Sequence, residues 1–568
     1  MQTNQTHLIR GLGLTAAISV NVANIIGTGV FLKARVMTCN VGTPGKALAV
    51  WVFAGLLALA GALTYAELLA MMPKDAGEYG IVRDAYGRLW GFLYGWTQFL
   101  IARSASAAAL AVGFAIFLND FLGGSLRYVY FSITLPGGYA VPFGRLQLIA
   151  LAAIAVTTLI NCAAVRVSGG VATVLTSLKV LLLVGVGVGA FVYSGGDWGH
   201  LSAANIGGTC EGVVTTGGFA GLAAAMLGAL WAYDGWNNVA FMAGEVKRPE
   251  RNLPLALIIS MFVVIGLYLF VNLSYYHVLT PTEIASVPAS SSTAAEVVRR
   301  LLGSVAVTLM AAAMMTSSFG ALHASILATA RVPYAMATDR LFFKALARLS
   351  PRTHVPVRSL IVLGVWASVL ALSGSYDMLT DYAIFALTIF YALTAGAVFI
   401  FRRRLPNANR PYRTWGYPIV PILFLVVSVW LILTTIWNTP KQSTIGLGLI
   451  SFGLLAYWYL LRVNKTKFLS VPHYAFLTAA VLGWIPLFIP ASVLLIPIVA
   501  LFFGWGWPET GWRWGVFLFL PTLFASLISA VGKSFRFALL PQIGFVVALA
   551  AITCICAYLG ARFSSRSA

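Results

Sequence analysis

Long apolar stretches alternate with short polar loops along most of this chain of 568 residues. Most of the stretches reach the length of about 20 apolar residues that a helix needs to cross a membrane. The pattern therefore predicts about twelve spanning helices in an all-α polytopic membrane protein. The stretches fall at about residues 12–37, 47–72, 86–119, 146–165, 170–193, 217–244, 254–278, 301–336, 357–374, 378–401, 417–437 and 443–462.

The chain beyond about residue 472 forms a separate unit. It holds further apolar stretches at about 474–503, 514–531 and 538–560, and three prolines interrupt the first of them. That stretch is either one kinked span or two short ones, because proline breaks a helix interior. We expect a twelve-helix core over residues 1–463 and a C-terminal appendage of three or four membrane helices over residues 464–568.

The first apolar stretch has a break at its centre, where two glycines flank a threonine in Gly27-Thr28-Gly29. Glycine in a helix interior costs about 1 kcal/mol relative to alanine. A helix that unwinds there leaves backbone groups that lipid cannot satisfy, so they must line a cavity or bind a ligand. The second half-helix would point its positive N-terminal end at an anionic group such as a carboxylate. A close helix–helix contact through small residues is an equally good interpretation.

The sixth apolar stretch contains a second break, because Asp234, Gly235, Asn237 and Asn238 lie in mid-span. Two discontinuous helices, five helices apart, indicate a secondary transporter built from inverted repeats. We therefore expect a five-plus-five inverted-repeat core with discontinuous first and sixth helices. The repeats would cover about residues 10–195 and 215–402, with two added helices over residues 415–463.

The composition, 60% hydrophobic and only 9% charged, excludes an ordinary soluble protein. The formal net charge of +21 does not indicate nucleic-acid binding here, because the basic residues lie mostly in loops. With the N-terminus in the cytoplasm, 21 lysines and arginines fall on the inside and 8 on the outside, Lys33 and Arg35 among the latter. This distribution follows the positive-inside rule.

Two charged regions near the expected inner face leave alternatives open. Residues 337–356 alternate leucine and phenylalanine with basic residues, as an interfacial amphipathic helix does, although a short solvated connector also fits. Glu67, towards the inner end of the second helix, is either a gate ion pair or an ordinary solvated charge.

Two basic residues lie within predicted spans. Lys179 is either a snorkelling side chain at the inner interface or an ammonium buried near the first-helix break. Arg103 in the third helix is expected to be a structural ion pair or a snorkelling side chain.

The sequence contains no residue pattern for catalysis, metal binding or a resident cofactor. No His, Cys, Asp and Glu cluster has metal-ligand spacing, and no Gly-rich loop is followed by Lys-Ser or Lys-Thr to hold phosphate. We therefore expect a protein that is not an enzyme and needs no cofactor.

Three segments resemble a known family. The run NIIGTGVFLKARVM is similar to the first helix of the amino acid–polyamine–organocation superfamily, and GALTYAELLAMMPKDAGEYGIVRDAYG to its second helix and following loop. The most specific run, ALWAYDGWNNVAFMAGEVKRPERNLPLALI, closely resembles the sixth helix and inner loop of the L-type amino acid transporter branch. The resemblance covers about residues 8–463.

The resemblance implies a binding site made largely of backbone. The amides of Gly27, Thr28 and Gly29 would hold an amino acid's carboxylate. The carbonyls of Ile25, Trp231 and Asp234 would meet its amino group, and Ala232 between them belongs to the same expected substrate-binding segment.

The resemblance also implies two further roles and one departure from the pattern. Trp231 would be the aromatic gate, and Lys179 would take the place of a sodium ion bound in sodium-coupled relatives. Animal L-type carriers bond a heavy chain through a cysteine after the third helix. Residues 120–145 hold no cysteine, so we expect no such partner.

Cys39 and Cys210 both fall on the predicted outer face and would tie the two halves together if bonded. A disulfide would need an oxidising compartment, and two free thiols are the alternative.

The sequence thus predicts a carrier of neutral L-amino acids in a cell membrane, with a bacterial inner membrane as the expected location. It would work by sodium-independent exchange or by proton coupling, and its partners would be the amino acid and the lipid bilayer. A carrier of cationic amino acids or polyamines, for which Asp234 is the available acid, and an amino-acid sensor on the same fold are the alternatives.

Overall fold

The structure, a computed structural model, describes residues 13–72, 77–135, 139–163, 168–193, 195–213, 215, 217–289, 291–350, 355–373, 376–438 and 440–463. Within these ranges every one of the twelve predicted apolar stretches contains a helix. The predicted appendage over residues 464–568 lies outside the described residues.

The described helices and strands follow one another in the order α1 Leu14–Ile25, α2 Gly29–Val41, α3 Pro44–Met71, α4 Gly77–Tyr86, α5 Arg88–Thr97, α6 Arg103–Phe121, β1 Val129–Leu135, β2 Tyr139–Gly144, α7 Arg145–Ala163, α8 Ser168–Val192, α9 Gly218–Tyr233, α10 Pro249–Val278, α11 Pro281–Ala285, α12 Thr293–Leu302, α13 Ser304–Thr329, α14 Arg331–Thr338, α15 Val357–Ser373, α16 Tyr376–Arg404, α17 Ile419–Asn438 and α18 Pro440–Val463. A π-helical turn, Gln98–Ala102, joins α5 to α6, and single 3₁₀ segments cover Trp198–Ser202, Asn238–Glu245 and Lys344–Ala347. The strands β1 and β2 pair as an antiparallel hairpin.

By length and composition, seven helical segments of the described chain can each cross a membrane, and the bent pair α1 and α2 makes an eighth. Shorter apolar helices lie at Ser177–Val192, Val357–Leu372 and Phe452–Leu461. Many apolar side chains remain exposed on the outside of the bundle, Phe53 on α3 and Leu181 on α8 among them. Lipid covers such side chains in a protein that spans the membrane several times.

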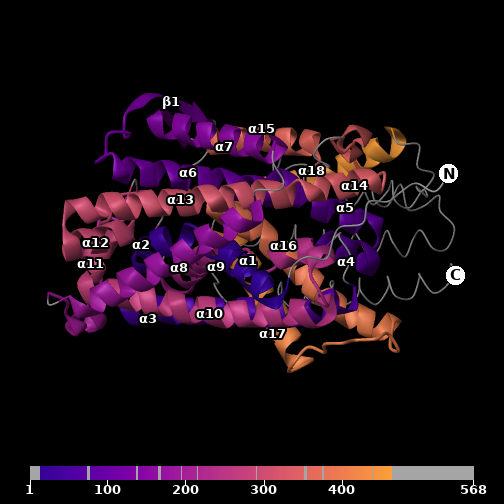
Figure 1. Cartoon of the computed structure of the whole chain (residues 1–568), viewed down its shortest axis with the longest axis horizontal. Coiled ribbons are helices and arrows are strands. Elements are labelled where there is room, and N and C mark those ends of the chain that lie inside the picture. Colours follow the sequence, from indigo (N-terminus) through magenta and orange to yellow (C-terminus); the bar gives the residue numbers. More distant parts are fainter. Residues whose placement is uncertain are drawn as a thin grey trace, which may run out of the picture.

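The long helices lie side by side in one bundle (Figure 1). In this view α6, α7, α13 and α15 run along one side, α3, α10 and α17 along the other, and α1, α2, α9 and α16 between them. The most extensive contacts join α6 to α13, α3 to α10 and α2 to α9. Each of these pairs joins helices that are far apart in the sequence, so the bundle brings distant segments of the chain side by side.

Two basic residues of the first apolar stretch are buried. Lys33 and Arg35, counted on the outside from the sequence, lie within α2. The Lys33 ammonium donates to the Thr380 hydroxyl over 2.6 Å and lies 4.0 Å from the Asp381 carboxylate. These contacts compensate for burial of the ammonium, which is why an apolar segment can contain it.

The predicted interfacial helix over residues 337–356 is wrong for its described part. After α14 ends at Thr338, the chain forms only the short 3₁₀ turn Lys344–Ala347. Leu341, Phe342 and Leu346 are buried against the bundle rather than turned to lipid.

Glu67 forms an ion pair at the end of α3, so the solvated alternative is wrong. Its carboxylate accepts from the Arg402 guanidinium over 2.9 and 2.7 Å and from the Thr414 amide over 2.7 Å. The Arg410 guanidinium lies 3.4 Å away. The ion pair ties α3 to the end of α16 and to the loop before α17.

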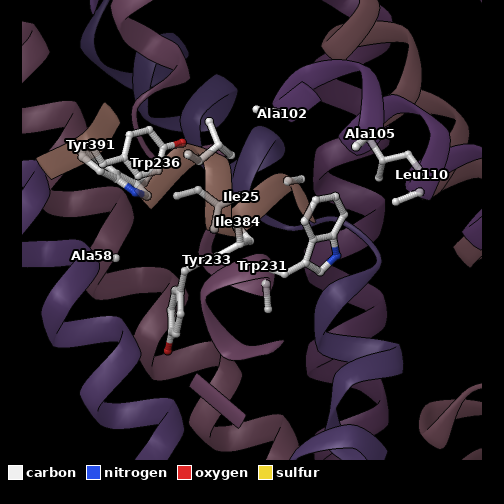
Figure 2. Packing of buried hydrophobic residues seen from close by; sticks show 14 of the residues in the cluster. Ile25, Ala58, Ala102, Ala105, Leu110, Trp231, Tyr233, Trp236, Ile384 and Tyr391 are labelled. Carbon is white, nitrogen blue, oxygen red and sulfur yellow. The ribbon is translucent and has the colours of Figure 1, made fainter. Parts of the chain in front are cut away.

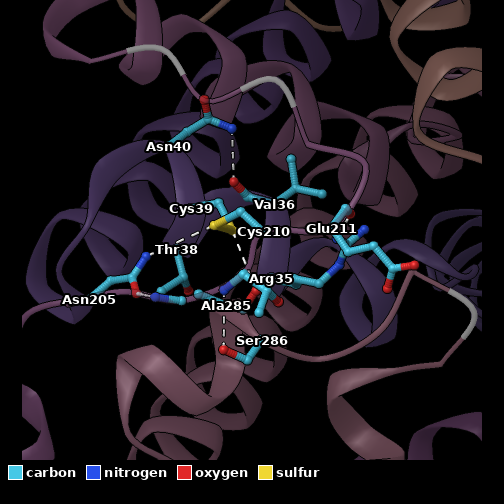
Figure 3. Close-up of a disulfide and its surroundings, with 12 residues drawn as sticks. Arg35, Val36, Thr38, Cys39, Asn40, Asn205, Cys210, Glu211, Ala285 and Ser286 are labelled. Atoms are coloured by element: carbon cyan, nitrogen blue, oxygen red, sulfur yellow. Dashed lines mark hydrogen bonds between the residues drawn. A yellow bond between two sulfur atoms is a disulfide. The ribbon is translucent and has the colours of Figure 1, made fainter.

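A disulfide joins Cys39 near the end of α2 to Cys210 before α9, with 5.8 Å between the two Cα atoms (Figure 3). This confirms the pairing considered from the sequence. The neighbouring Arg35 guanidinium donates to the Glu211 carbonyl, so a second contact holds the same segment against α2.

Candidate functional site

The first helix is broken where the sequence predicts it. The helix α1 ends at Ile25, α2 begins at Gly29, and the two are bent by 44°. Within the described residues, the amides of Gly27, Thr28 and Gly29 donate to no backbone carbonyl. Free amides at the start of a 13-residue helix, together with its dipole, make an anion-binding end.

The two glycines of this break have different reasons to be glycine. A Cβ atom built on Gly29 would lie 2.5 Å from the Cα of Ala232, so α2 packs directly on the backbone of α9 there. A Cβ atom on Gly27 would lie at ordinary contact distances, 3.8 Å from the Leu110 side chain and 4.0 Å from the Ile25 carbonyl oxygen. The helix-contact interpretation therefore explains Gly29, whereas the space beside Gly27 stays open.

The second break meets the first one directly. The helix α9 ends at Tyr233, and the chain turns through Asp234 and Gly235 before the 3₁₀ segment begins at Asn238. Gly235 has a φ of +99°, a conformation that glycine adopts without strain. A Cβ atom there would lie 2.6 Å from the Asn24 carbonyl oxygen, so glycine lets the second break approach the last turn of α1.

A cavity lies at this junction. Of the predicted site residues, it is lined by Ile25, Gly27, Thr28, Gly29, Trp231 and Asp234. Its further lining residues are Asn24, Arg103, Ser106, Leu110, Gly235, Asn238, Ala321 and Ser325. Ala232 is the one predicted substrate-binding residue outside the lining, because it is buried against Gly29.

Trp231 closes one side of the cavity through a hydrogen bond. Its indole N–H donates to the Tyr376 hydroxyl over 2.8 Å, and that hydroxyl also lies 2.8 Å from the Thr28 hydroxyl. In Figure 2 the Trp231 and Tyr233 side chains leave α9 in different directions, and Trp236 and Tyr391 lie together away from Trp231. Trp231 and Tyr376 thus join the α1–α2 break to the start of α16.

A buried ion pair forms part of the cavity wall. The Arg103 guanidinium donates to one Asp234 carboxylate oxygen over 3.1 Å, and the Tyr391 hydroxyl donates to the other over 2.7 Å. Arg103 directly follows the π-helical turn, an irregularity often found at functional sites. Asp234 thus takes part through its side chain, whereas the sequence interpretation assigned a role only to its backbone carbonyl.

Behind the ion pair lies a second, fully buried acid. The Asn237 amide donates to the Glu78 carboxylate on α4, and the Tyr65 hydroxyl donates to it over 3.2 Å. Burial raises the pKa of Glu78 to about 7, against an ordinary value of 4.5, although the positive charge of Arg103 opposes the rise. Among the described residues, the network therefore contains one carboxylate paired with arginine and one for which no ion pair is seen.

Lys179 reaches the first break from α8. Its ammonium donates to the Ile26 carbonyl over 3.1 Å and to the Ala23 carbonyl over 3.4 Å, and the residue is only 4% exposed. The snorkelling interpretation is therefore wrong. The Lys179 side chain thus contacts the carbonyl end of α1, while the amides of the break start α2.

Tyr268 on α10 ties the two breaks together. Its hydroxyl lies 3.1 Å from the Ile25 carbonyl and 2.8 Å from the Ala232 carbonyl. A hydroxyl has one proton to donate, so it satisfies only one of these two oxygens at a time.

The chain matches the family model described as amino acid permease over residues 12–456. It belongs to the amino acid permease family. The permease is 30% identical to the serine/threonine exchanger SteT of Bacillus subtilis over 470 residues, which cover 82% of this chain and all of the relative.

Two further relatives are human proteins. The b(0,+)-type amino acid transporter 1 is 30% identical over 457 residues, 80% of the permease and 88% of the relative. The large neutral amino acids transporter small subunit 2 is 28% identical over 456 residues, 79% of the permease and 80% of the relative. The permease is therefore an all-α, multi-pass membrane protein of the amino acid–polyamine–organocation superfamily, on its L-type-like branch, and not an enzyme.

Several residues of the cavity and its network escaped the sequence analysis. Tyr391 is an ordinary aromatic residue within an apolar stretch, Tyr376 lies just before that stretch, and Ser106 is an ordinary polar residue. Asn238 was noted only as part of the second break. Arg103 gave a signal as a charge within a span, but nothing in the sequence connects it with Asp234, 131 positions away.

Proposed function

We propose that the permease exchanges neutral L-amino acids across the membrane without sodium, by alternating access. The observation that carries this proposal is the α1–α2 break, whose amides donate to no backbone carbonyl of the described chain and whose residues line a cavity. An amino acid presents a carboxylate to such amides, whereas an apolar solute gives them no partner.

In this proposal the amides of Gly27, Thr28 and Gly29 bind the substrate carboxylate. The substrate amino group lies against the carbonyls of Ile25 and of the Trp231–Asp234 segment. An unwound helix exposes amide donors on one side of the break and carbonyl acceptors on the other. This supports the positions proposed for both the carboxylate and the amino group. The Ile25 carbonyl is available when the Tyr268 hydroxyl donates to Ala232 instead.

We propose Lys179 as the residue that makes sodium unnecessary. Its ammonium already occupies the carbonyl oxygens of Ala23 and Ile26 that end α1. Those oxygens need a positive partner, and a covalently held ammonium supplies one throughout the cycle. The same group serves either as a fixed cation in an exchanger or as the coupling group of a proton symporter.

The Arg103–Asp234 ion pair favours neutral over cationic substrates. A cationic carrier needs a carboxylate that is free to pair with the substrate, and Asp234 is already paired and hydrogen-bonded. The relatives carry names that include serine/threonine exchange and large neutral amino acids, which agrees with a neutral substrate.

Alternating access would come from the five-plus-five inverted repeat, residues about 10–195 and 215–402, with α17 and α18 added within the core of residues 1–463. The pairing of α3 with α10 and of α6 with α13 supports this proposal, because each helix meets the one at the corresponding place in the other half. Trp231 would be the gate, released when its bond to Tyr376 breaks. Residues 464–568 would form the membrane appendage.

We further propose a cell-membrane location with the N-terminus in the cytoplasm, in a bacterial inner membrane. The excess of basic residues in the loops assigned to the inside supports this orientation. The Cys39–Cys210 disulfide then lies on the outer face, where oxidising conditions preserve disulfides. Residues 120–145 contain no cysteine, so we propose that no disulfide-linked heavy chain is needed.

The proposal is tested by counterflow in proteoliposomes. Vesicles preloaded with unlabelled amino acid, and empty vesicles, receive one labelled amino acid against a panel of neutral, cationic and acidic competitors. The measurement is repeated in choline, in sodium and with a pH gradient. We expect uptake that needs internal amino acid, is equal in choline and sodium, and is competed by neutral amino acids.

Three other results would redirect the assignment. Competition by lysine, arginine or polyamines alone would indicate the cationic carrier. Uptake into empty vesicles driven by a pH gradient would indicate proton symport. Substrate-induced thermal stabilisation without any uptake would indicate a sensor.

A further inference from the structure

Three polar side-chain atoms around the cavity have no hydrogen-bond partner among the described residues. They are Nε of Arg103, Oγ of Ser106 and Oδ1 of Asn238. All three residues line the cavity, and Arg103 and Ser106 are at least 95% buried. Buried polar atoms normally find a partner, so each such exception requires an explanation.

The chemistry of these atoms is mixed. The Arg103 Nε–H is a donor, the Asn238 Oδ1 is an acceptor, and the Ser106 hydroxyl is both. Arg103 and Ser106 lie on α6, three residues apart and therefore on one face of the helix, while Asn238 begins the segment after the second break. The backbone donors of the first break line the same cavity, so the three atoms are separate from the groups proposed for the substrate carboxylate.

The charges of Arg103 and Asp234 balance on this side of the cavity. The second guanidinium nitrogen of Arg103 donates to Asp234, and the third lies 3.3 Å from the Tyr391 hydroxyl, so Nε is the nitrogen left over. The Arg103–Asp234 pair carries no net charge, and a buried cation or anion added beside it would have no counterion. Leu110 and Ala321 complete the lining with apolar surface.

We propose that Arg103, Ser106 and Asn238 form a side-chain subsite that selects amino acids with a hydroxyl or carboxamide side chain. The subsite rests on the proposed function, since it places the substrate backbone at the α1–α2 break. A hydroxyl or carboxamide supplies both a donor and an acceptor, and it adds no charge. An aliphatic side chain of the same shape leaves all three atoms without partners.

The test compares substrates that differ in polarity but hardly in shape. KM for counterflow is measured with threonine against valine and with asparagine against leucine. A site that hydrogen-bonds a substrate hydroxyl rejects the analogue that lacks it far better than an apolar pocket does. We expect kcat/KM for threonine to exceed that for valine by about tenfold or more.

Two variants test whether the proposed subsite causes the preference for threonine over valine. Ser106→Ala and Asn238→Ala should each lower the threonine-to-valine ratio several-fold, mainly by weakening threonine, and the unfolding temperature of each purified variant without ligand reports whether it is folded. Ser104→Ala is the matched control. It lies on the same helix and is buried, but its hydroxyl donates to the Phe99 carbonyl and it does not line the cavity. Its ratio should equal that of the wild type.

A wild-type ratio near one, or a ratio that neither variant changes, would overturn the subsite while leaving amino acid exchange intact. A fall of the same size in Ser104→Ala would also overturn it, because the effect would then belong to the helix as a whole. Absence of counterflow with every amino acid would instead refute the proposed function itself.

Discussion

Replacing Lys179 with methionine removes one ammonium from the carbonyl end of α1 and nearly preserves the side-chain length. The ammonium donates to the carbonyls of Ile26 and Ala23 over 3.1 and 3.4 Å in a buried setting. Methionine cannot donate a hydrogen bond, so both oxygens lose this donor. The substitution therefore acts on the geometry of the break and leaves the cavity lining unchanged.

The expected magnitude follows from these two bonds. A hydrogen bond to a charged group contributes about 1.5–3 kcal/mol, and the longer of the two bonds contributes least. Burying the ammonium costs desolvation free energy, and this cost offsets part of the free energy that the two hydrogen bonds contribute. A net loss of about 3 kcal/mol from the transport-competent break lowers its population, and hence kcat/KM, about a hundredfold.

The assay is counterflow in proteoliposomes for wild type, Lys179→Met and Lys179→Arg, each in choline and in sodium. Lys46→Met is the control, because this lysine is exposed near the start of α3. We expect the control to match the wild type and the wild type to be indifferent to sodium. Normal counterflow by Lys179→Met, or strong stimulation of the wild type by sodium, would show that Lys179 does not replace a sodium ion.

Three further changes have definite expected results. Gly29→Ala should lower thermal stability in detergent by about 1–3 kcal/mol, because its Cβ would lie 2.5 Å from the Ala232 Cα; an unchanged unfolding temperature would contradict that contact. Arg103→Gln should leave the Asp234 carboxylate unpaired and admit lysine or arginine as competitors in counterflow; continued exclusion of both would show that the pair does not set charge preference. Burial raises the pKa of Glu78 from 4.5 to about 7, so the folded protein binds this proton more tightly than the unfolded chain does. The resulting stability is fully present below about pH 4.5 and is lost as the pH rises to about 7. The unfolding temperature of the wild type should therefore fall more between pH 5 and pH 8 than that of Glu78→Gln, and parallel curves would refute this assignment.

The two helix breaks were predictable because their residues are unsuited to the apolar membrane-spanning stretches that contain them. Two glycines around Thr28, and Asp234 beside Gly235, are poor material for a lipid-facing helix, so sequence alone indicates unwound segments at mid-span. The positions of α1, α2 and α9 confirm this interpretation. Apolar length likewise predicted the helical stretches, since a spanning helix must satisfy its own backbone.

The contacts across the cavity were not predictable from one sequence. Arg103 and Asp234 meet only after α6 and α9 pack in the bundle, and Tyr376 reaches Trp231 from the start of α16. Sequence spacing also gives equal weight to Gly27 and Gly29. Their different roles appear only when the neighbouring Leu110 and Ala232 atoms are in place.

The prediction of an interfacial helix after α14 was wrong for a related reason. Leu341, Phe342 and Leu346 alternate with basic residues as an interfacial helix would, but the bundle provides a protein surface that buries them instead. An apolar stripe needs only an apolar neighbour, and its spacing does not say whether that neighbour is lipid or protein.

The central claim is that the first break binds the substrate carboxylate, and Gly27 tests it most directly. A Cβ atom fits there at 3.8 Å from the Leu110 side chain, so Gly27→Val is expected to fold while its methyl groups enter the cavity beside the amides. The measurement is the shift in unfolding temperature of purified wild type and Gly27→Val caused by threonine and by threonine methyl ester, which lacks a free carboxylate. We expect a shift only for wild type with threonine, and equal unfolding temperatures of the two proteins without ligand. Equal shifts by threonine and its ester in the wild type, or an undiminished threonine shift in Gly27→Val, would contradict it.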